Sequence, residues 1–298
     1  MGDFMKISEL LKQKRTLSFE TFPPKYGDTE SLDKTYSILD ELAKFEPDFI
    51  SVTYGAGGSN SKDNVNIASY IKNKLNIEAL AHLTGGPSSY SDVDKVIKDL
   101  KDNNIENILA LRGDKPEYYT DEYCKYFKHA TDLMEYIKDK GFALAGACYP
   151  EGHIEAKSLY DDLVYMKKKE EMGATFFITQ VFYDNNYYYR LVNEARKIGI
   201  KSPIIPGVMP LTSPKSISKI KSMCGSTIPL DYLNMIEVYQ DNPKVFRELG
   251  YNYTVYQIID LIAKGAPGIH LYVMNNVNTA KEILDRIPNV IREFFKNK

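Results

Sequence analysis

The sequence predicts a closed barrel of eight parallel strands and eight helices, a (β/α)8 or TIM barrel, as one catalytic domain spanning residues 1–298. Eight short apolar runs recur along the chain, and stretches with helical periodicity lie between them. The runs are apolar almost throughout, which is typical of parallel strands covered on both faces. Eight such units fit the usual length of this barrel.

The predicted strands are rich in β-branched and aromatic residues. In chain order they are 16–22, 49–54, 78–85, 107–114, 143–150, 176–183, 202–210 and 268–275. Pro23 and Pro24 end the first strand, because proline lacks the N–H that a strand ladder needs. An open doubly wound sheet is the alternative, but the first strand–helix junction has no glycine-rich dinucleotide fingerprint.

The predicted helices between these strands carry apolar residues on one face. They are 31–45, 64–75, 92–103, 129–141, 158–173 and 187–199. Several end at glycine, as helices commonly do. The interval 211–267 is too long for one helix and contains two further periodic stretches. We therefore expect an extra helical excursion between strands seven and eight, besides the seventh helix.

Composition argues for a cytoplasmic protein that acts on a small molecule. Acidic residues number 40 and basic residues 38, so no overall positive field favours nucleic acid or an anionic membrane. Cys124, Cys148 and Cys224 are too widely spaced for a disulfide framework or a metal cluster, and the four histidines lack zinc-ligand spacing. No signal peptide and no membrane-spanning run is recognisable. We expect no bound metal, and any iron–sulfur cluster would lie on another chain.

Polar residues lie near the carboxyl ends of several predicted strands, which is the end of a barrel where catalytic groups gather. They are Glu20, Thr53, His82, Arg112, Asp114, Tyr149, Gln180, Asn275 and Asn276. Glu20 is the most unusual, since an unpaired carboxylate is costly to bury in an apolar strand. A position facing a cavity would explain it, because a partly desolvated carboxyl is useful as an acid.

Each of these features also has a simpler structural interpretation. Arg112 and Asp114 could form an ordinary ion pair, and His82 or His153 could be hydrogen-bonded core histidines. The lysines near Lys169 could belong to a solvated helix surface. No nucleophile elbow, Walker loop or CxxC motif is present. A barrel glycosidase that uses Glu20 and Asp114 as its acid pair is a second possible enzyme class.

Eight motifs in order resemble the flavin-dependent methylenetetrahydrofolate reductases over residues 10–290. They are SFETFPP, SVTYGAGGS, AHLTGG, LALRGD, YPEGHIEAK, ITQVFYD, IIPGVMP and HLYVMNN. The resemblance implies reduction of 5,10-methylenetetrahydrofolate to 5-methyltetrahydrofolate through FAD. It also implies two half-reactions at one flavin face, with NAD(P)H as the usual electron donor.

The same resemblance assigns roles to individual residues. Glu20 matches the family's general acid, and Asp114 matches a catalytic aspartate that lies between flavin and pterin. Gln180 matches a glutamine that contacts folate or nicotinamide, and Ser216 is a further folate-binding candidate. The matched flavin-binding positions are Thr53, His82, Arg112, Gly113, Asp114, Tyr119, Thr120, Tyr149, His153, Asp162, Lys168 and Lys169.

Two departures from the family pattern concern the donor and the folate tail. Ile220 replaces an aromatic residue that often stacks on nicotinamide, and Asn276 replaces an arginine associated with folate. The donor is therefore either NAD(P)H or an iron–sulfur partner subunit, as in acetogenic members. We expect a homo- or hetero-oligomer. A folate-binding or electron-transfer subunit that does not complete turnover is the non-enzymatic alternative.

Overall fold

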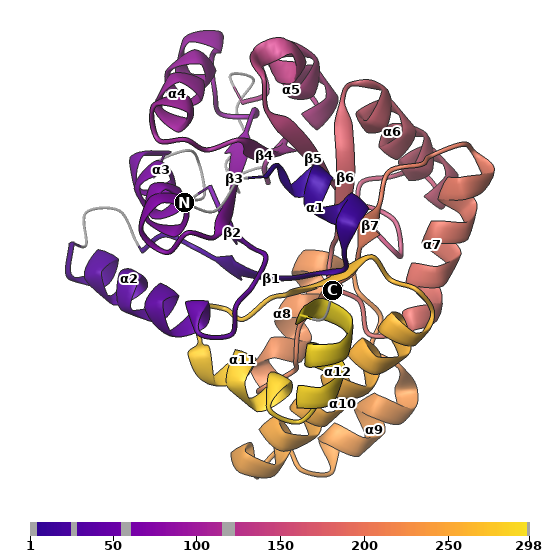
Figure 1. Cartoon of the computed structure of the whole chain (residues 1–298). Coiled ribbons are helices and arrows are strands. Elements are labelled where there is room, and N and C mark those ends of the chain that lie inside the picture. The colour runs from indigo at the N-terminus through magenta and orange to yellow at the C-terminus, as the bar shows by residue number, and fades with distance from the viewer. Residues whose placement is uncertain (1–4, 25–28, 55–60, 115–122, 297–298) are drawn as a thin grey trace.

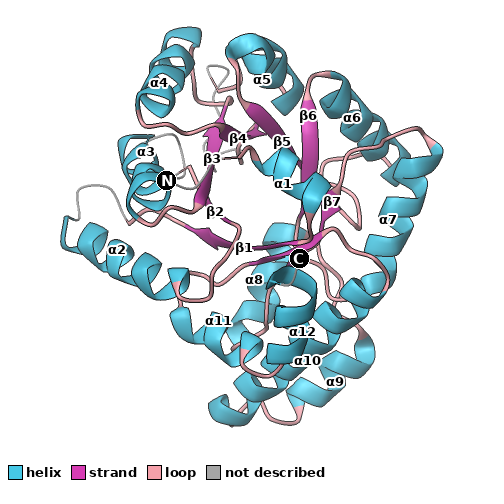
Figure 2. Ribbon diagram, in the orientation of Figure 1, coloured by secondary structure: helices cyan, strands magenta, loops and turns pink. Residues whose placement is uncertain are grey.

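The computed structural model describes residues 5–24, 29–54, 61–114 and 123–296. Within these ranges the strands pair in parallel around a ring, with helices packed outside it (Figures 1 and 2). The strands are β1 (Thr16–Thr21), β2 (Phe49–Val52), β3 (Glu78–Thr84), β4 (Asn107–Leu111), β5 (Ala143–Cys148), β6 (Ala174–Thr179), β7 (Ile204–Ile205), β8 (Gly207–Val208) and β9 (Gly268–Leu271). The predicted β/α barrel is confirmed.

The predicted seventh strand is broken into two short pieces. β7 pairs with β6, where Ile204 lies opposite Phe177, and β8 pairs with β9, where Gly207 lies opposite His270. Pro206 separates the pieces because it has no N–H to donate to a ladder. Its carbonyl still accepts a hydrogen bond from the His270 backbone N–H, with an N···O distance of 3.0 Å. One segment thus joins both neighbouring strands and brings the ring round to closure.

Some strands end earlier than their apolar runs suggest. The run 107–114 leaves the sheet after Leu111, and Gly113 has a φ of 90°. A Cβ at Gly113 would lie 2.2 Å from Thr84 Cγ2, so both the backbone angle and the contact require glycine. The chain therefore turns over the end of the barrel and carries Arg112 and Asp114 to its rim.

Helices cover the outside of the ring at every predicted position. They are α2 (Thr29–Ala43), α3 (Ser61–Ser69), α4 (Tyr90–Asp102), α5 (Ala130–Ile137), α6 (Leu159–Glu171), α7 (Asn185–Lys197), α10 (Pro243–Ala263), α11 (Val277–Leu284) and α12 (Pro288–Ile291). α3 continues into one π turn, Tyr70–Lys74. Among the described residues, no helix is both long enough and apolar enough to cross a membrane.

The barrel has an inner and an outer apolar layer, and alternation along the strands separates them. On β1, Leu17 and Phe19 point outward into the large core between strands and helices. Inside the ring, Phe49, Phe176 and neighbouring aliphatic side chains fill the end at which the strands begin. The other end of the interior is left for polar side chains.

A short N-terminal helix, α1 (Ile7–Gln13), lies across the filled end of the barrel (Figure 1). Ile7 belongs to the inner core, and its N–H donates to Asn107 Oδ1 over 2.9 Å. Asn107 in turn donates to Glu78, which is paired with the buried Lys72 through Nζ–Oε distances of 2.6 and 2.8 Å. A buried polar network therefore connects α1, β3, β4 and the π turn.

The predicted helical excursion is confirmed between β8 and β9. The two predicted stretches fall in α9 (Leu230–Glu237) and α10, and α8 (Pro214–Cys224) is the helix that follows the seventh strand region. α8 and α9, called the excursion from here on, pack around a small core that they share with α10 and the segment after β6. Ile220 of α8 and Tyr232 and Ile236 of α9 are buried there. The excursion is held against the barrel through α10, whose Gly250 lies so close to Leu211 that a Cβ would meet the Leu211 carbonyl at 1.9 Å.

Candidate active site

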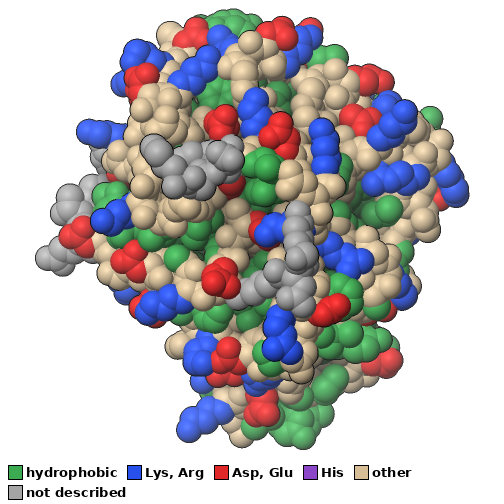
Figure 3. Space-filling model, viewed as in Figure 1, with side chains coloured by type: hydrophobic (Ala, Val, Ile, Leu, Met, Phe, Trp, Pro, Cys, Tyr) green, Lys and Arg blue, Asp and Glu red, His purple; other side chains and the backbone are tan. Residues whose placement is uncertain are grey.

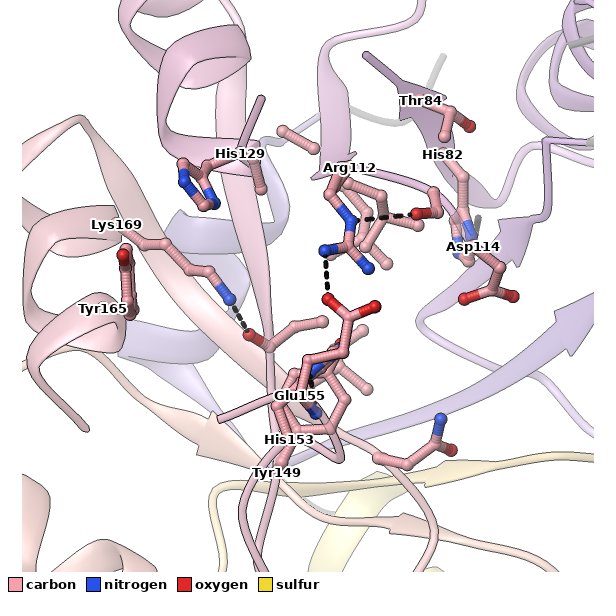
Figure 4. A pocket seen from close by; sticks show the side chains of 18 of the residues that line it. His82, Thr84, Arg112, Asp114, His129, Tyr149, His153, Glu155, Tyr165 and Lys169 are labelled. Carbon is pink, nitrogen blue, oxygen red and sulfur yellow. Dashed lines mark hydrogen bonds and ion pairs between the residues drawn. The ribbon is translucent and has the colours of Figure 1, made fainter. Parts of the chain in front are cut away.

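A cavity of about 880 Å³ opens at the carboxyl ends of the strands. Arg112 and Asp114 reach it from the end of β4, His153 from the loop after β5 and Lys169 from α6 (Figure 4). The predicted site residues that line it are Glu20, Thr53, His82, Arg112, Gly113, Asp114, Tyr149, His153, Asp162, Lys169 and Gln180. The carboxyl ends of the strands, where catalytic residues of such barrels lie, therefore bring together residues that are up to 160 positions apart in the sequence.

Glu20 lies on the wall of this cavity because it occupies an inward position of β1. Its outward neighbours Phe19 and Thr21 are fully buried, whereas about a fifth of the Glu20 side chain is exposed. Burial raises the pKa of Glu20 to about 8. The carboxyl group is therefore mostly protonated at neutral pH and can donate a proton.

His82 lies close to Glu20 in the cavity wall. Its Nε2 lies 3.8 Å from Glu20 Oε2, which is too long for a hydrogen bond. Burial lowers the pKa of His82 to about 3, so the two groups meet as a neutral acid and a neutral imidazole, not as an ion pair. The buried Nε2 has no hydrogen-bond partner among the described residues, and this nitrogen can bond to a ligand.

A second histidine lies deeper inside the ring. His270 Nδ1 is 2.8 Å from Ser18 Oγ, and its Nε2 is 3.4 Å from Ser51 Oγ. Burial and the nearby His82 lower the pKa of His270 to about 3, so it too is neutral. Tyr272 follows two positions later and donates its hydroxyl to Thr179 O at 2.8 Å. These side chains fix the polar floor of the cavity.

Arg112 and Glu155 form an ion pair at the cavity rim, with an Nη1–Oε2 distance of 2.6 Å (Figure 4). Glu155 comes from the loop after β5, so the pair joins two neighbouring strand ends. The Glu155 N–H also donates to His153 Nδ1 over 3.1 Å. The guanidinium group is thereby oriented at the edge of the cavity, and its remaining N–H groups can bind a ligand anion.

A second set of polar side chains lies on the loop after β5 and on α6. Lys169 Nζ donates to Ala147 O over 2.7 Å, and burial lowers the pKa of this lysine. Asp162 accepts from the His153 N–H at 3.2 Å, and burial raises its pKa. Tyr149 packs edge-on against His153, with 4.7 Å between ring centroids. This wall offers a cation, a carboxyl group and an aromatic surface.

Several predicted residues lie elsewhere. The Lys168 Nζ lies 4.9 Å from the centre of the Tyr165 ring, and Lys168 is not among the cavity-lining residues. Ser216 is on α8, bonded to its own helix start, and it too is not part of the lining. Tyr119 and Thr120 fall outside the described residues.

The two departures from the family pattern are also located. Ile220 is buried in the small core of the excursion, and Asn276 caps the start of α11 by accepting from the Asn278 N–H. Neither side chain lines the cavity.

Sequence reasoning missed some of the lining residues. Glu155, Tyr272, His129 and Tyr165 all contribute to the cavity. Tyr272 could have been found by alternation, since it lies two positions after His270 and directly follows β9, within the predicted strand 268–275. Glu155 gave no local signal, because its partner Arg112 is 43 positions away.

Comparisons with known proteins agree with this architecture. The family model described as methylenetetrahydrofolate reductase matches residues 5–288. A Pectobacterium carotovorum protein named 5,10-methylenetetrahydrofolate reductase is 32% identical over 286 residues, covering 95% of this chain and 94% of that protein. The Escherichia coli protein of the same name is 32% identical over 275 residues, covering 90% and 88%.

Plant relatives are longer. An Arabidopsis thaliana protein named methylenetetrahydrofolate reductase (NADH) 1 is 34% identical over 295 residues, which is 94% of this chain and 49% of that protein. The chain thus spans about half the length of the plant relatives it matches.

A solved structure of an uncharacterised Clostridium thermocellum protein, described as binding two copies of 5-methyl-5,6,7,8-tetrahydrofolic acid, has the same fold. Its TM-score is 0.65 and its identity is 14%, over 95% of this chain and 100% of that one. This likeness supports the barrel alone. The family model and the bacterial relatives, however, cover nearly the whole chain, and the chain therefore belongs to the methylenetetrahydrofolate reductase family.

Proposed function

We propose that this protein reduces 5,10-methylenetetrahydrofolate to 5-methyltetrahydrofolate with FAD as its cofactor and Glu20 as the general acid. Family membership supplies the reaction. The observation that supports the mechanism is a buried carboxyl group whose pKa is raised to about 8, on the wall of a large cavity. A perturbed acid in such a position is typical of catalytic sites.

The residues of the cavity fit a flavin dinucleotide. Its volume of about 880 Å³ is near the upper end for ligand pockets, as a large cofactor with a substrate beside it requires. Arg112 and Lys169 supply positive charge for phosphate oxygens, and Asp162 can accept from ribityl or ribose hydroxyls. The unpartnered Nε2 of His82 is available for a polar ring atom. Thr53, Gly113, Tyr149 and His153 complete the proposed binding surface.

Glu20 would act by holding a proton until the substrate needs it. Its neighbour His82 is neutral, so no counter-charge lowers the pKa of Glu20. The protonated carboxyl can give its proton to an amine nitrogen of the folate, which opens the one-carbon bridge. FAD bound in this cavity and reduced by the electron donor would supply the hydride for this carbon.

Gln180 and Asp114 would orient the substrate. The Gln180 Oε1 accepts from the Val181 N–H at 2.9 Å, which leaves its NH₂ group to donate to a ligand. Asp114 lines the same cavity, and its carboxylate oxygens can accept from the amino groups of a pterin. Ser216, Tyr119, Thr120 and Lys168 remain family-based candidates.

Two sources of electrons are considered for this reaction. NAD(P)H is the first proposal, and an iron–sulfur partner subunit is the alternative. Both donors need to be tested, because the position at which relatives often carry a nicotinamide-stacking aromatic residue is Ile220 here. Ile220 is buried in the excursion core, and α8 contributes no aromatic side chain to the cavity lining.

Mixing the flavin-loaded protein with NADH under anaerobic conditions distinguishes the two proposed electron donors. Stoichiometric bleaching of the flavin absorbance within seconds would establish NADH as the donor. Flavin that is bleached by dithionite or a reduced dye but not by NADH or NADPH would exclude the nucleotides.

Replacing Asp114 with asparagine is expected to raise the reduction potential of the bound flavin. Removing a negative charge beside the flavin stabilises its reduced, more negative form. We expect a shift on the order of 30 mV, which equals about 1.4 kcal/mol for a two-electron couple. Equilibrium dye titration of the flavin measures it. Glu151→Gln, outside the lining, is the matched control, and an unchanged potential in Asp114→Asn would contradict the proposed contact.

A further inference from the structure

The strand that carries Glu20 loses its backbone pairing on one side before it reaches this residue. On that side β1 pairs with β9, and the last residues in register are Phe19 and Leu271. Beyond Leu271 the chain is still bonded to β8, where the Tyr272 N–H donates to the Val208 carbonyl over 2.9 Å. Glu20 therefore lies one residue past the end of the ladder between β1 and β9.

Hydrogen bonds from the Asn275 side chain replace this ladder where it ends. Its Oδ1 accepts from the Thr21 hydroxyl at 2.8 Å and from the Phe22 N–H at 3.1 Å, and its NH₂ group donates to the Phe22 carbonyl at 2.9 Å. The next residues, Pro23 and Pro24, have no N–H to donate. One amide side chain thus joins the end of β1 to the segment after β9 by three hydrogen bonds.

The turn that presents Asn275 has an unfavourable backbone conformation. Met274 and Asn275 have φ angles of 53° and 52°. Across them, the Asn276 N–H donates to the Val273 carbonyl over 3.0 Å, which closes a turn with two left-handed residues. Asparagine tolerates this region, whereas methionine adopts it at an energetic cost, and Met274 is half exposed, so packing does little to hold it. The three bonds to β1 therefore hold a strained turn in place.

We propose that Asn275 is a positioning residue for Glu20, an inference that rests on the proposed function of Glu20 as the general acid. The Asn275 side chain does not line the cavity, so it acts through the backbone of β1. On the other side of β1, pairing with β2 continues past Glu20 as far as Thr21. By fixing the two residues that follow Glu20 on the β9 side, Asn275 keeps the carboxyl group on the cavity wall, 3.8 Å from His82.

Asn275→Gly tests this role without adding strain or charge. Glycine accepts a positive φ, so the variant keeps the turn and loses the three side-chain bonds. Asn104→Gly is the matched control, because Asn104 also has a positive φ, 61°, and its side chain donates to Asn73 near the start of β4. Neither exchange alters a charge, so the mixture of acidic and basic side chains on the face shown in Figure 3 stays the same.

The titration of Glu20 is the first readout, and it does not depend on turnover. Infrared difference spectra, taken between each protein and the same protein carrying Glu20→Gln, identify the protonated carboxyl band of Glu20. We expect a midpoint of about 8 in the unaltered protein and in Asn104→Gly. In Asn275→Gly it should be at least about 0.5 pH unit lower, because water reaches the loosened carboxyl group. His82 and Tyr272, which face Glu20, are neutral in this range and are kept in both variants.

The rate of folate reduction is the second readout. Each flavin-loaded protein is reduced with dithionite and mixed with 5,10-methylenetetrahydrofolate in a stopped-flow instrument. Asn275→Gly should slow reoxidation of the flavin by about 5- to 50-fold, because a small displacement of a catalytic group is costly. It should keep its flavin, and Asn104→Gly should react at the unaltered rate. In Glu20→Gln the Asn275→Gly exchange should have little further effect, because Asn275 acts through Glu20.

These outcomes distinguish positioning from a general loss of stability. Circular dichroism verifies that each variant is folded at the temperature of the assay. An unchanged Glu20 midpoint in Asn275→Gly, or equal slowing with and without Glu20→Gln, would overturn the proposal. Failure of the unaltered protein to form 5-methyltetrahydrofolate would instead contradict the proposed function, and the infrared midpoint would still show whether Asn275 controls the environment of Glu20.

Discussion

Glu20→Gln is expected to slow folate reduction by about 10²- to 10⁴-fold, the usual contribution of a general acid. Glutamine keeps the shape and polarity of the side chain but cannot release a proton at this site. The protein should keep its flavin, and reduction of that flavin should change little. Stopped-flow measurement of the two half-reactions separates these effects.

The pH dependence provides an independent check on the same group. A general acid must be protonated, and burial raises the pKa of Glu20 to about 8. The rate of folate reduction by the unaltered protein should therefore fall as the pH rises through about 8, and Glu20→Gln should lose this dependence. Loss of the flavin, or a variant that retains full folate reduction, would show that Glu20 is structural or irrelevant.

Glu20→Gln should also stabilise the fold above pH 5. The folded pKa of Glu20 lies above its ordinary value of 4.5, so its contribution to stability is present below pH 4.5 and is lost as the pH rises toward 8. Glutamine avoids that loss. We expect a gain of about 1–3 kcal/mol at pH 7 and none near pH 4, measured by urea unfolding.

Lys72→Met is expected to lower the free energy of unfolding by about 3–5 kcal/mol, the usual cost of leaving a buried charge without its partner. Lys72 is 1% exposed and pairs with both oxygens of Glu78, which also accepts from the Met5 N–H and from Asn107. Without the lysine, the Glu78 carboxylate stays buried beneath α1. Urea unfolding monitored by circular dichroism measures the loss.

Two further variants complete this test. Lys98→Met, which removes an exposed pair with Asp102 on α4, should cost about 0.5 kcal/mol or less. The double variant Lys72→Met with Glu78→Gln should lose less than the sum of the two single losses, because it removes both buried charges. A Lys72→Met protein as stable as the Lys98→Met protein would contradict the buried network.

Much of the barrel could be predicted because its signals are local. Apolar runs and helical periodicity located all eight strand regions and the excursion. The break at Pro206 was harder to predict, because a proline in a run indicates disruption but does not say that the two halves pair with different neighbours. The Lys72–Glu78–Asn107 network was not predictable for a similar reason. It depends on a π turn and on contacts between three separate segments.

The candidate site also combines features that the sequence predicts with features that only the folded arrangement defines. Glu20, His82 and Arg112 could be located because the carboxyl ends of the strands all lie at the same end of a barrel. Their environment could not be predicted: the neutral state of His82 and the raised pKa of Glu20 depend on burial, which only the folded arrangement defines. Lys168 illustrates the reverse case, since its neighbour Lys169 enters the cavity while Lys168 covers Tyr165.

A single turnover tests the central claim most directly, because it does not depend on the identity of the electron donor. The purified protein, loaded with FAD and reduced anaerobically with dithionite, is mixed with 5,10-methylenetetrahydrofolate. We expect the flavin to be reoxidised and one equivalent of 5-methyltetrahydrofolate to form per flavin. Reduced flavin that persists without forming this product, or a protein that cannot be loaded with FAD, would contradict the proposed function.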